Sequence, residues 1–592
     1  MTSTAATLPH WNLADLYQGP DDPSLKTDLG TLAEAAKSFS ETYSGTIAGL
    51  SGADLGAAIA TYENLMEQAG RIISFAQLWF ATRVEDPEAG RFHQTMQEKI
   101  TDINSATLFF TLEINRLADD ALNAKMADPA AARFAPWVRD LRVFRDHQLS
   151  DDLEKMLTEK SVTGSGAWTR LFEETIASLR FDLEGKQATV SEALVMLSDK
   201  DPTKRQAAGR EVGRVLGQNG RIFSLITNTL AKDKEIEDRW RHYPRPVSAR
   251  NRANLVEDEV VDALVSAVQS SYDSIAHRYY ALKARWMGQE KLSIWDRNAP
   301  LPEDDDAKIT WGDAKSRVLN AYGAFDPKMR DIANTFFDKN WIDAEPRAGK
   351  DSGAFAHPTV PSAHPYVMMN YHGKTRDVMT LAHELGHGVH QVLASEKGYL
   401  LSDTPLTLAE TASVFGEMLT FRSLLDAETD PGRRRVLLAG KVEDMINTVV
   451  RQTAFFEFER RLHDARRDGE LSSSDICGLW LGVQKESLGP VFDFDDGYEY
   501  YWSYIPHFIH TPFYVYAYAF GDCLVNALYD VFQSGHPEFQ KRYLEMLQAG
   551  GTLRHKELLA PFGLDASDPA FWSRGLSIIS GFIDELEEAL PA

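Results

Sequence analysis

Helical periodicity dominates this sequence and constrains its fold more than any other feature. Residues 53–83, 88–117 and 257–287 are rich in Ala, Leu, Glu, Gln, Arg and Met, and they carry apolar residues at three- and four-residue spacing. Strand signals are few, and the clearest is the short segment 366–371. We therefore predict a mainly α fold that includes only a small β-sheet.

The length of the chain indicates more than one domain. Its 592 residues exceed the size at which a single hydrophobic core stops growing. The stretch from Ser198 to Pro202 has the composition of a turn followed by a helix start. We therefore predict an N-terminal helical domain over residues 1–200 and a second domain over residues 201–592.

The charge balance and the cysteine count exclude several classes of protein. There are 62 basic and 87 acidic residues, so the formal net charge is -25, which repels nucleic acid and anionic membrane surfaces. No apolar run reaches the roughly 18 residues of a membrane-spanning helix, and residues 1–13 lack the pattern of a signal peptide. Only Cys477 and Cys523 occur, which fits a reducing compartment. We expect a cytoplasmic protein that binds neither nucleic acid nor membrane.

One segment, residues 383–387, carries a metal-binding pattern and reads His-Glu-Leu-Gly-His. Thr375 can cap the helix that carries it. His383 and His387 are four residues apart, so their side chains project from one helical face about one turn apart. Two imidazoles so placed can hold one Zn²⁺, and Glu384 leans toward the open position, where it can take a proton from zinc-bound water.

A zinc site of this kind needs a third protein ligand. One class of zinc peptidase takes it from a histidine ten residues after the first, but Leu393 stands at that position, and Glu396 lies too far along the same helix. Two carboxylates remain, Glu410 and Glu417, on one face of a second predicted helix over residues 406–425. We favour Glu410, because small and apolar residues surround it and an unpaired carboxylate there would be costly. Glu417 could then orient a ligand.

A late segment, residues 499–521, concentrates aromatic and histidine side chains. Amide hydrolysis develops negative charge on the carbonyl oxygen of the cleaved bond, and a Tyr hydroxyl or a His N–H can stabilise that charge. His507 and Tyr514 are seven residues apart and could share one helical face, with Tyr518 one turn further, although Pro512 interrupts this geometry. The alternative is that the tyrosines belong to an aromatic core helix.

Together these pieces resemble the thimet oligopeptidase superfamily of zinc metallopeptidases, and specifically its oligoendopeptidase F branch. The matching segments are spread over most of the chain: WNLADLY at 11–17, YVMMNY at 366–371, TLAHELGH at 380–387, AETAS at 409–413 and IPHF at 505–508. The combination of the zinc motif with the glutamate segment and the late His/Tyr segment is much more specific than the motif alone.

The resemblance implies a role for each candidate residue. It assigns four residues to the metal site: His383, His387 and Glu410 as ligands of one zinc ion per chain, and Glu384 as the general base. It further implies that His507 and a tyrosine near Tyr514 bind substrate and stabilise the transition state. The spacing leaves open whether Tyr514, Tyr516 or Tyr518 takes that role.

The resemblance also implies an architecture. The family fold is almost entirely helical, with an N-terminal helical domain that closes over a zinc metallopeptidase catalytic domain, here residues 201–592. A deep central channel admits short peptides and excludes folded proteins. A small sheet beside the motif helix pairs with the substrate backbone, and we expect residues 366–371 to supply its edge.

We therefore predict a zinc-dependent endopeptidase that hydrolyses internal bonds of short oligopeptides by Glu-assisted attack of zinc-bound water. One alternative is a metallo-exopeptidase of the carboxypeptidase Taq type, which needs basic groups to hold the free C-terminus of its substrate. A second alternative is a catalytically inactive peptide-binding protein. The sequence does not predict the oligomeric state.

Overall fold

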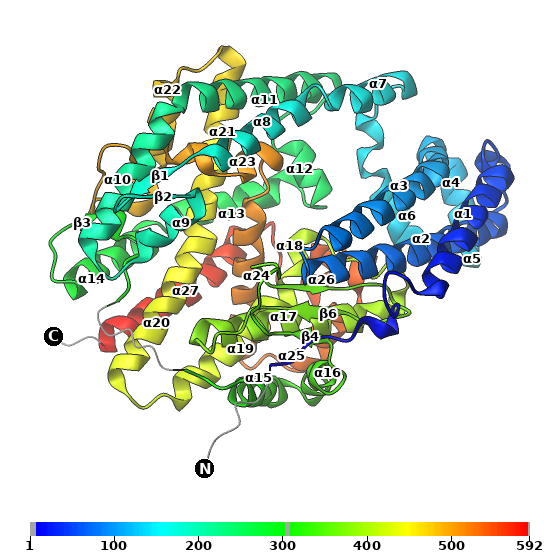
Figure 1. The fold of residues 1–592 in the computed structure, drawn as a ribbon. Coiled ribbons are helices and arrows are strands. Elements are labelled where there is room, and N and C mark those ends of the chain that lie inside the picture. Colours follow the sequence, from blue (N-terminus) through cyan, green and yellow to red (C-terminus); the bar gives the residue numbers. More distant parts are fainter. Residues whose placement is uncertain (1–7, 302–307, 590–592) are drawn as a thin grey trace. The chain divides into compact units, whose positions relative to one another are not determined.

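The computed structural model describes residues 8–301 and 308–589 and consists mainly of α-helices (Figure 1). The prediction of a mainly α fold is therefore confirmed. The chain forms two compact units, each built from three stretches. The first unit comprises Met1–Arg145, Asp306–Ala427 and Val531–Leu564, and the second comprises Asp146–Asp305, Glu428–Asp530 and Asp565–Ala592.

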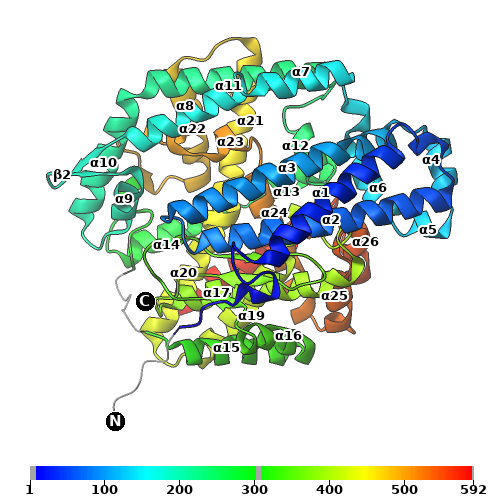
Figure 2. The same cartoon turned by 45° about the vertical axis from the view of Figure 1, so that its right-hand side comes forward.

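Helices make up most of the first unit. Their bounds are α1 Pro23–Tyr43, α2 Gly52–Ala81, α3 Pro87–Arg116, α4 Asp119–Met126, α5 Pro129–Ala132, α6 Ala135–Leu141, α15 Trp311–Phe325, α16 Pro327–Asp338, α17 Thr375–Ala394, α18 Leu406–Ala409, α19 Thr411–Ala427, α25 Phe539–Gln548 and α26 His555–Leu559. The periodic segments 53–83 and 88–117 correspond to α2 and α3. Figure 1 and Figure 2 both show α1, α2 and α3 running side by side. Buried aromatic rings such as Phe39, Phe75 and Phe110 pack between them.

A three-stranded sheet in the first unit has the strand order β4 (Ile342–Asp343), β6 (Tyr366–Met368), β5 (Phe355–His357). The β6 strand pairs in parallel with β4 and antiparallel with β5, so that Val367 lies opposite both Ile342 and Ala356. The strand predicted within 366–371 therefore exists, but the expectation that it forms the sheet edge is wrong. It is the central strand, because the long loop before it folds back as β5 and takes the edge.

The second unit is also helical. Its elements are α7 Asp151–Ser161, α8 Ser165–Ser178, β1 Phe181–Leu183, β2 Lys186–Ala188, α9 Val190–Val195, α10 Pro202–Gln218, α11 Gly220–Trp240, α12 Ser248–Ala253, α13 Asp258–Ser270, α14 Arg278–Trp286, β3 Leu292–Ser293, α20 Pro431–Ile446, α21 Gln452–Asp468, α22 Ser473–Leu488, β7 Phe492–Asp493, α23 His507–His510 and α27 Pro569–Ala589. Helix α24 (Tyr516–Gln533) runs across the division between the units. The periodic segment 257–287 is not one helix, because a π-helical turn, Asp273–His277, separates α13 from α14.

The helix start predicted near residue 200 is confirmed. Helix α10 begins at Pro202, and the Asp201 side chain accepts a hydrogen bond from the Thr203 N–H at 2.8 Å. The domain boundary proposed at this point, between 1–200 and 201–592, remains a prediction.

Two further observations concern membrane-spanning helices and disulfide bonds. None of the helices in the described ranges is both long enough and apolar enough to span a bilayer. Cys477 and Cys523 are both buried and unpaired.

Candidate metal centre

The site is built where α17 crosses α19 in the first unit. Helix α17 begins at Thr375 with Lys374 as its N-cap residue, and Asp377 accepts hydrogen bonds from the His372 and Lys374 N–H groups at 2.7 and 2.9 Å. The capping role expected of Thr375 is thus taken by its neighbours. A Cβ atom added at Gly386 would lie 2.4 Å from the Ala412 carbonyl oxygen. The glycine of the motif therefore allows the two helices to approach closely.

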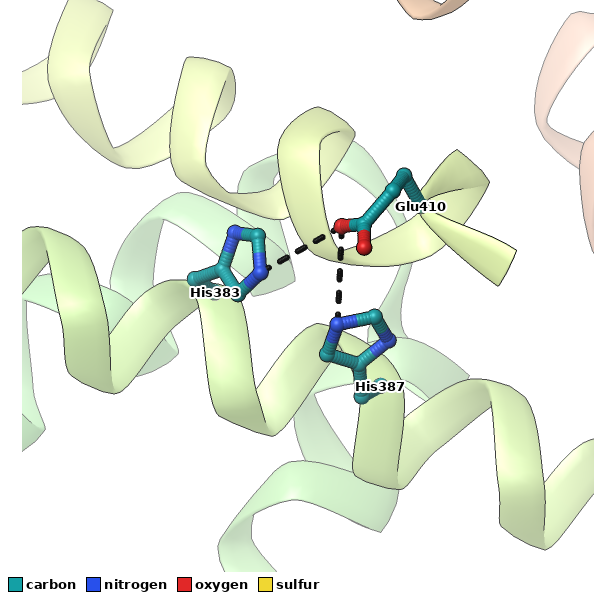
Figure 3. Close-up of side chains that lie close together, drawn as sticks. All are labelled: His383, His387 and Glu410. Atoms are coloured by element: carbon teal, nitrogen blue, oxygen red, sulfur yellow. Dashed lines mark ion pairs between the residues drawn. The ribbon is translucent and has the colours of Figure 1, made fainter. Parts of the chain in front are cut away.

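Three side chains converge at this crossing (Figure 3). The Glu410 Oε2 lies 3.3 Å from the Nε2 of His383 and 3.5 Å from the Nε2 of His387. The two imidazole rings stand nearly perpendicular, at an interplanar angle of 82°. Glu410 occupies a break between α18 and α19, so the single helix predicted over 406–425 is wrong at this residue.

The two distances from Glu410 to the histidine nitrogens fit a tetrahedral metal ion. With bonds of about 2.0–2.1 Å, two ligand atoms at tetrahedral corners lie about 3.3–3.4 Å apart. The two measured nitrogen-to-oxygen distances, 3.3 and 3.5 Å, agree with that value. Two imidazole nitrogens and one carboxylate oxygen are also the donor set of many catalytic zinc sites, which leave a fourth position for water or substrate.

Neighbouring groups orient these three side chains. The Glu417 Oε2 lies 3.4 Å from the Nδ1 of His383, and the Ser413 hydroxyl donates to Glu410 Oε2 at 2.7 Å. The Ala409 carbonyl accepts a hydrogen bond from the His387 ring. Burial lowers the pKa of His383, but the hydrogen bond to Glu417 and the nearby carboxylates outweigh it and raise that pKa to about 9. Such partners fix the ring orientation and favour cation binding.

Glu384 is buried beside the ligands, with 7% of its surface exposed. Its carboxylate accepts a hydrogen bond from the Ala356 N–H of β5, and burial raises its pKa to about 7. The carbonyl oxygen of Ala356 in turn accepts a hydrogen bond from the Gln391 side chain at 3.2 Å. The edge strand β5 thus packs directly on the motif helix, a contact that the sequence did not indicate because β5 carries no strand signal.

A pocket opens beside His387 within the first unit. Trp137, Trp341 and Tyr399 give it apolar walls, and Asp403 adds a carboxyl group. His390 lines the same pocket but is buried, and its Nε2 lies 3.4 Å from the Thr404 hydroxyl.

His507 and the late tyrosines lie in the second unit. The Nε2 of His507 lies 3.3 Å from the Tyr518 hydroxyl, and its ring stacks on Tyr514 with centroids 6.0 Å apart. Tyr516 is fully buried, and its hydroxyl accepts a hydrogen bond from Asn254 at 2.8 Å. Of the three tyrosines, Tyr514 and Tyr518 therefore adjoin His507, whereas Tyr516 belongs to the core.

The segment reaches this arrangement through an irregular turn. Phe513 has a φ of 61°, in the left-handed region that non-glycine residues rarely adopt. The buried carboxyl group of Glu459 accepts a hydrogen bond from the Phe513 N–H at 2.9 Å, and Arg250 donates to the Pro512 carbonyl at 3.3 Å. Neither Glu459 nor Arg250 was singled out from the sequence, because nothing local marks a side chain that holds a distant turn.

Comparisons with known proteins identify the family of this chain. Residues 195–578 match the family described as Peptidase family M3, and residues 113–181 match the one described as Oligopeptidase F. The Oligopeptidase PepF of Bacillus subtilis (strain 168) is 27% identical, over 98% of this chain and 87% of its own. The Oligoendopeptidase F homolog of Borreliella burgdorferi is 24% identical, over 89% of this chain and 90% of its own. The crystal structure of oligoendopeptidase-F from Enterococcus faecium shares the fold, with a TM-score of 0.72 and 23% identity over 96% of this chain and 98% of that one.

Proposed function

Because the chain belongs to the oligoendopeptidase F branch of peptidase family M3 and is a metalloendopeptidase, we propose that it is a zinc enzyme that hydrolyses internal bonds of short oligopeptides. The observation that carries the zinc assignment is the convergence of His383, His387 and Glu410, with both histidine nitrogens at near-tetrahedral distances from the Glu410 carboxylate. The preference for short peptides rests on the resemblance to this family.

Glu384 is the proposed general base. When bound, Zn²⁺ supplies a Lewis acid that lowers the pKa of water and polarises the carbonyl oxygen of the bond to be cleaved. A carboxylate oxygen of Glu384 takes the proton of the attacking water and then gives it to the nitrogen of the leaving amine. Burial of Glu384 beside the ligands supports this role, since a proton held there is shielded from bulk solvent.

His507 and Tyr514 are the proposed donors to the carbonyl oxygen as it becomes negative. Burial, and next the charge of His510, lowers the pKa of His507, so that its ring is neutral and can donate one N–H near neutral pH. Tyr514 stacks on this ring and presents a phenolic hydroxyl of the same kind. Tyr518 is the alternative donor, because its hydroxyl contacts the same histidine.

The proposed partners are short peptides, with neither nucleic acid nor membrane among them. The acidic net charge of -25 supports this choice. The proposed location is the cytoplasm, which the two unpaired cysteines support.

Digestion of a peptide blocked at both ends tests the proposal. We expect cleavage at an internal bond, its loss after treatment with a chelator, and its return when zinc is added back. An endopeptidase needs no free terminus, so hydrolysis restricted to peptides with free C-termini would favour the carboxypeptidase alternative. Absence of hydrolysis in zinc-loaded protein would favour an inactive peptide-binding protein.

A further inference from the structure

Arg297 and Arg451 are two partly buried arginines of the second unit, and the Nε of Arg451 is fully buried. Arg297 directly follows a short 3-10 helix, Ile294–Asp296. Arg451 is the last residue of a π-helical turn, Asn447–Arg451, which joins α20 to α21. Such turns are rare and are frequently found at functional sites.

Neither arginine has a carboxylate partner among the described residues. Neither side chain forms an ion pair or a hydrogen bond with the described part of the chain, and the Nε of Arg451 is fully buried without any partner. Arg205 of the same unit shows the usual arrangement, because it donates two hydrogen bonds to Asp296 at 3.0 and 2.6 Å. The two arginines are therefore unusual for partly buried cations, which commonly face a carboxylate.

The two guanidinium groups are also close enough to repel each other. Burial, and next the positive charge of Arg297, lowers the pKa of Arg451. The other main electrostatic neighbours of Arg451 are the phenols of Tyr504, Tyr498 and Tyr280, which are neutral near pH 7. The pair thus concentrates positive charge where nothing in the described chain neutralises it.

Aromatic side chains surround the pair. Arg451 lies over the Phe455 ring at 4.9 Å. The Tyr498 hydroxyl donates to Gln484 and the Tyr501 hydroxyl donates to the Gly209 carbonyl, each at 2.9 Å. The Tyr280 and Tyr504 hydroxyls, in contrast, have no hydrogen-bond partner in the described ranges.

The backbone at Arg297 is held in place independently. The buried ammonium of Lys283 donates to the Arg297 carbonyl at 2.8 Å and to the Glu443 carboxylate at 2.6 Å. The nearby carboxylate of Glu443 is therefore already paired with a different cation. The backbone of Arg297 is therefore held by Lys283, while its guanidinium group stays available to a ligand, as expected of a preformed binding group.

We propose that Arg297 and Arg451, together with the Tyr280 and Tyr504 hydroxyls, form a binding site for a carboxylate group. A carboxylate offers two oxygens with about four acceptor positions, which match two planar guanidinium forks and two hydroxyls. Its negative charge would also remove the repulsion between the arginines. Bound carboxylate would therefore stabilise the second unit.

The carboxylate can come from two sources. One is a free small carboxylate such as acetate. The other is the C-terminal or acidic side-chain carboxylate of a peptide, and this source rests on the proposed peptidase function. The site itself does not depend on that function, so the first experiment reads binding without activity.

The first experiment measures thermal unfolding of the full-length protein while sodium acetate is raised at constant pH and ionic strength. We expect the wild-type Tm to rise with acetate. The rise should be absent in Arg297→Met and Arg451→Met, and smaller in Tyr504→Phe, which removes one hydroxyl only. Arg221→Met is the matched control, because Arg221 is exposed in the same unit and has no ion pair with the described residues, and it should respond as the wild type does.

Baseline stability separates a binding site from a structural role. Without acetate, Arg451→Met should unfold at or above the wild-type Tm, because it removes an unpaired and partly buried charge. A wild-type Tm that does not respond to acetate, or a response that survives in both methionine variants, would overturn the proposal. If the methionine variants fail to fold, the milder Tyr504→Phe variant decides between the same outcomes.

The second experiment identifies the source. Hydrolysis of one peptide sequence is compared with a free C-terminus and with a C-terminal amide. If peptides use the site, the wild type should favour the free acid in kcat/KM by about tenfold or more, and Arg451→Met should remove the preference. Equal rates for both peptides, together with the acetate response above, would identify a free carboxylate as the occupant.

Discussion

The metal centre and the His507–Tyr518 segment contain similar chemical groups but are built in different ways. The candidate metal centre places two proposed ligands one turn apart on the regular helix α17, and a glycine brings the third proposed ligand close. The His507–Tyr518 segment instead joins the short helix α23 to α24 through a turn in which Phe513 has a positive φ. Regular spacing makes the candidate metal centre predictable from sequence, whereas the His507–Tyr518 segment depends on distant side chains that hold its turn.

The largest effect should come from Glu384→Gln, which tests whether the candidate metal centre supplies proton transfer as well as metal binding. The amide keeps the size of the side chain but cannot accept the proton, so we expect turnover to fall roughly 10²- to 10⁴-fold. Bound zinc, measured by elemental analysis, should be unchanged. The control is Glu396→Gln, an exposed residue just after the same helix, and retained turnover in Glu384→Gln would contradict the assignment.

The second region is tested by removing single hydroxyls. Tyr514→Phe should lower kcat about 10²- to 10³-fold, as the loss of one oxyanion donor does in other enzymes. Tyr516→Phe should leave kcat nearly unchanged and reduce stability, because its hydroxyl is buried against Asn254. A larger loss in Tyr518→Phe than in Tyr514→Phe would transfer the role to Tyr518.

Gly386→Ala tests the helix crossing on which the metal centre depends. The added methyl would meet the Ala412 carbonyl oxygen and Ser413 Cα at 2.4 and 2.6 Å, so α19 must shift. We expect a loss of about 1–3 kcal/mol in the free energy of unfolding and weaker zinc binding. Gly30→Ala is the control: the site has open space in helix α1 and should gain up to about 1 kcal/mol from helix propensity. Equal behaviour of the two variants in denaturant titration would contradict the close crossing.

A gradual, pH-dependent effect concerns Glu459, the residue that holds the Phe513 turn. Burial raises the pKa of Glu459 to about 8, above that of an unfolded chain, so the folded state favours the protonated form. The stabilising effect is therefore complete at low pH and is lost as the pH rises toward 8. Relative to Glu459→Gln, we expect wild-type stability to fall by about 1 kcal/mol per pH unit between pH 5 and 8. A pH-independent difference between the two proteins would show that Glu459 is not protonated in this range.

The convergence of the three proposed metal ligands could be predicted from the sequence, because it depends largely on local spacing. The four-residue spacing of His383 and His387 needs only one helix, and Leu393 at the position of a third histidine leaves Glu410 and Glu417 as candidates for the third ligand. The break at Glu410 was missed, because helical pattern alone does not reveal where a side chain interrupts two helices. Likewise, the order of strands β4, β6 and β5 depends on which loop folds back, and that is decided by packing against α17.

The late segment shows the limit of the same reasoning. Helical spacing did not distinguish Tyr514, Tyr516 and Tyr518, because Pro512 left undetermined which side of the segment each side chain occupies. The left-handed Phe513 rotates the chain so that Tyr516 enters the core while the other two adjoin His507. A non-glycine residue in that conformation has no sequence signature, so the distinction could only come from the structure.

Zinc content is the most direct test of the central claim that His383, His387 and Glu410 hold one metal ion. Elemental analysis of purified protein should give one zinc per chain for the wild type and for Asp426→Asn, a control on the exposed face of helix α19. His387→Ala and Glu410→Gln should each lose the metal after dialysis against a weak chelator that leaves the wild type loaded. Zinc retained by Glu410→Gln as tightly as by the wild type would contradict the account.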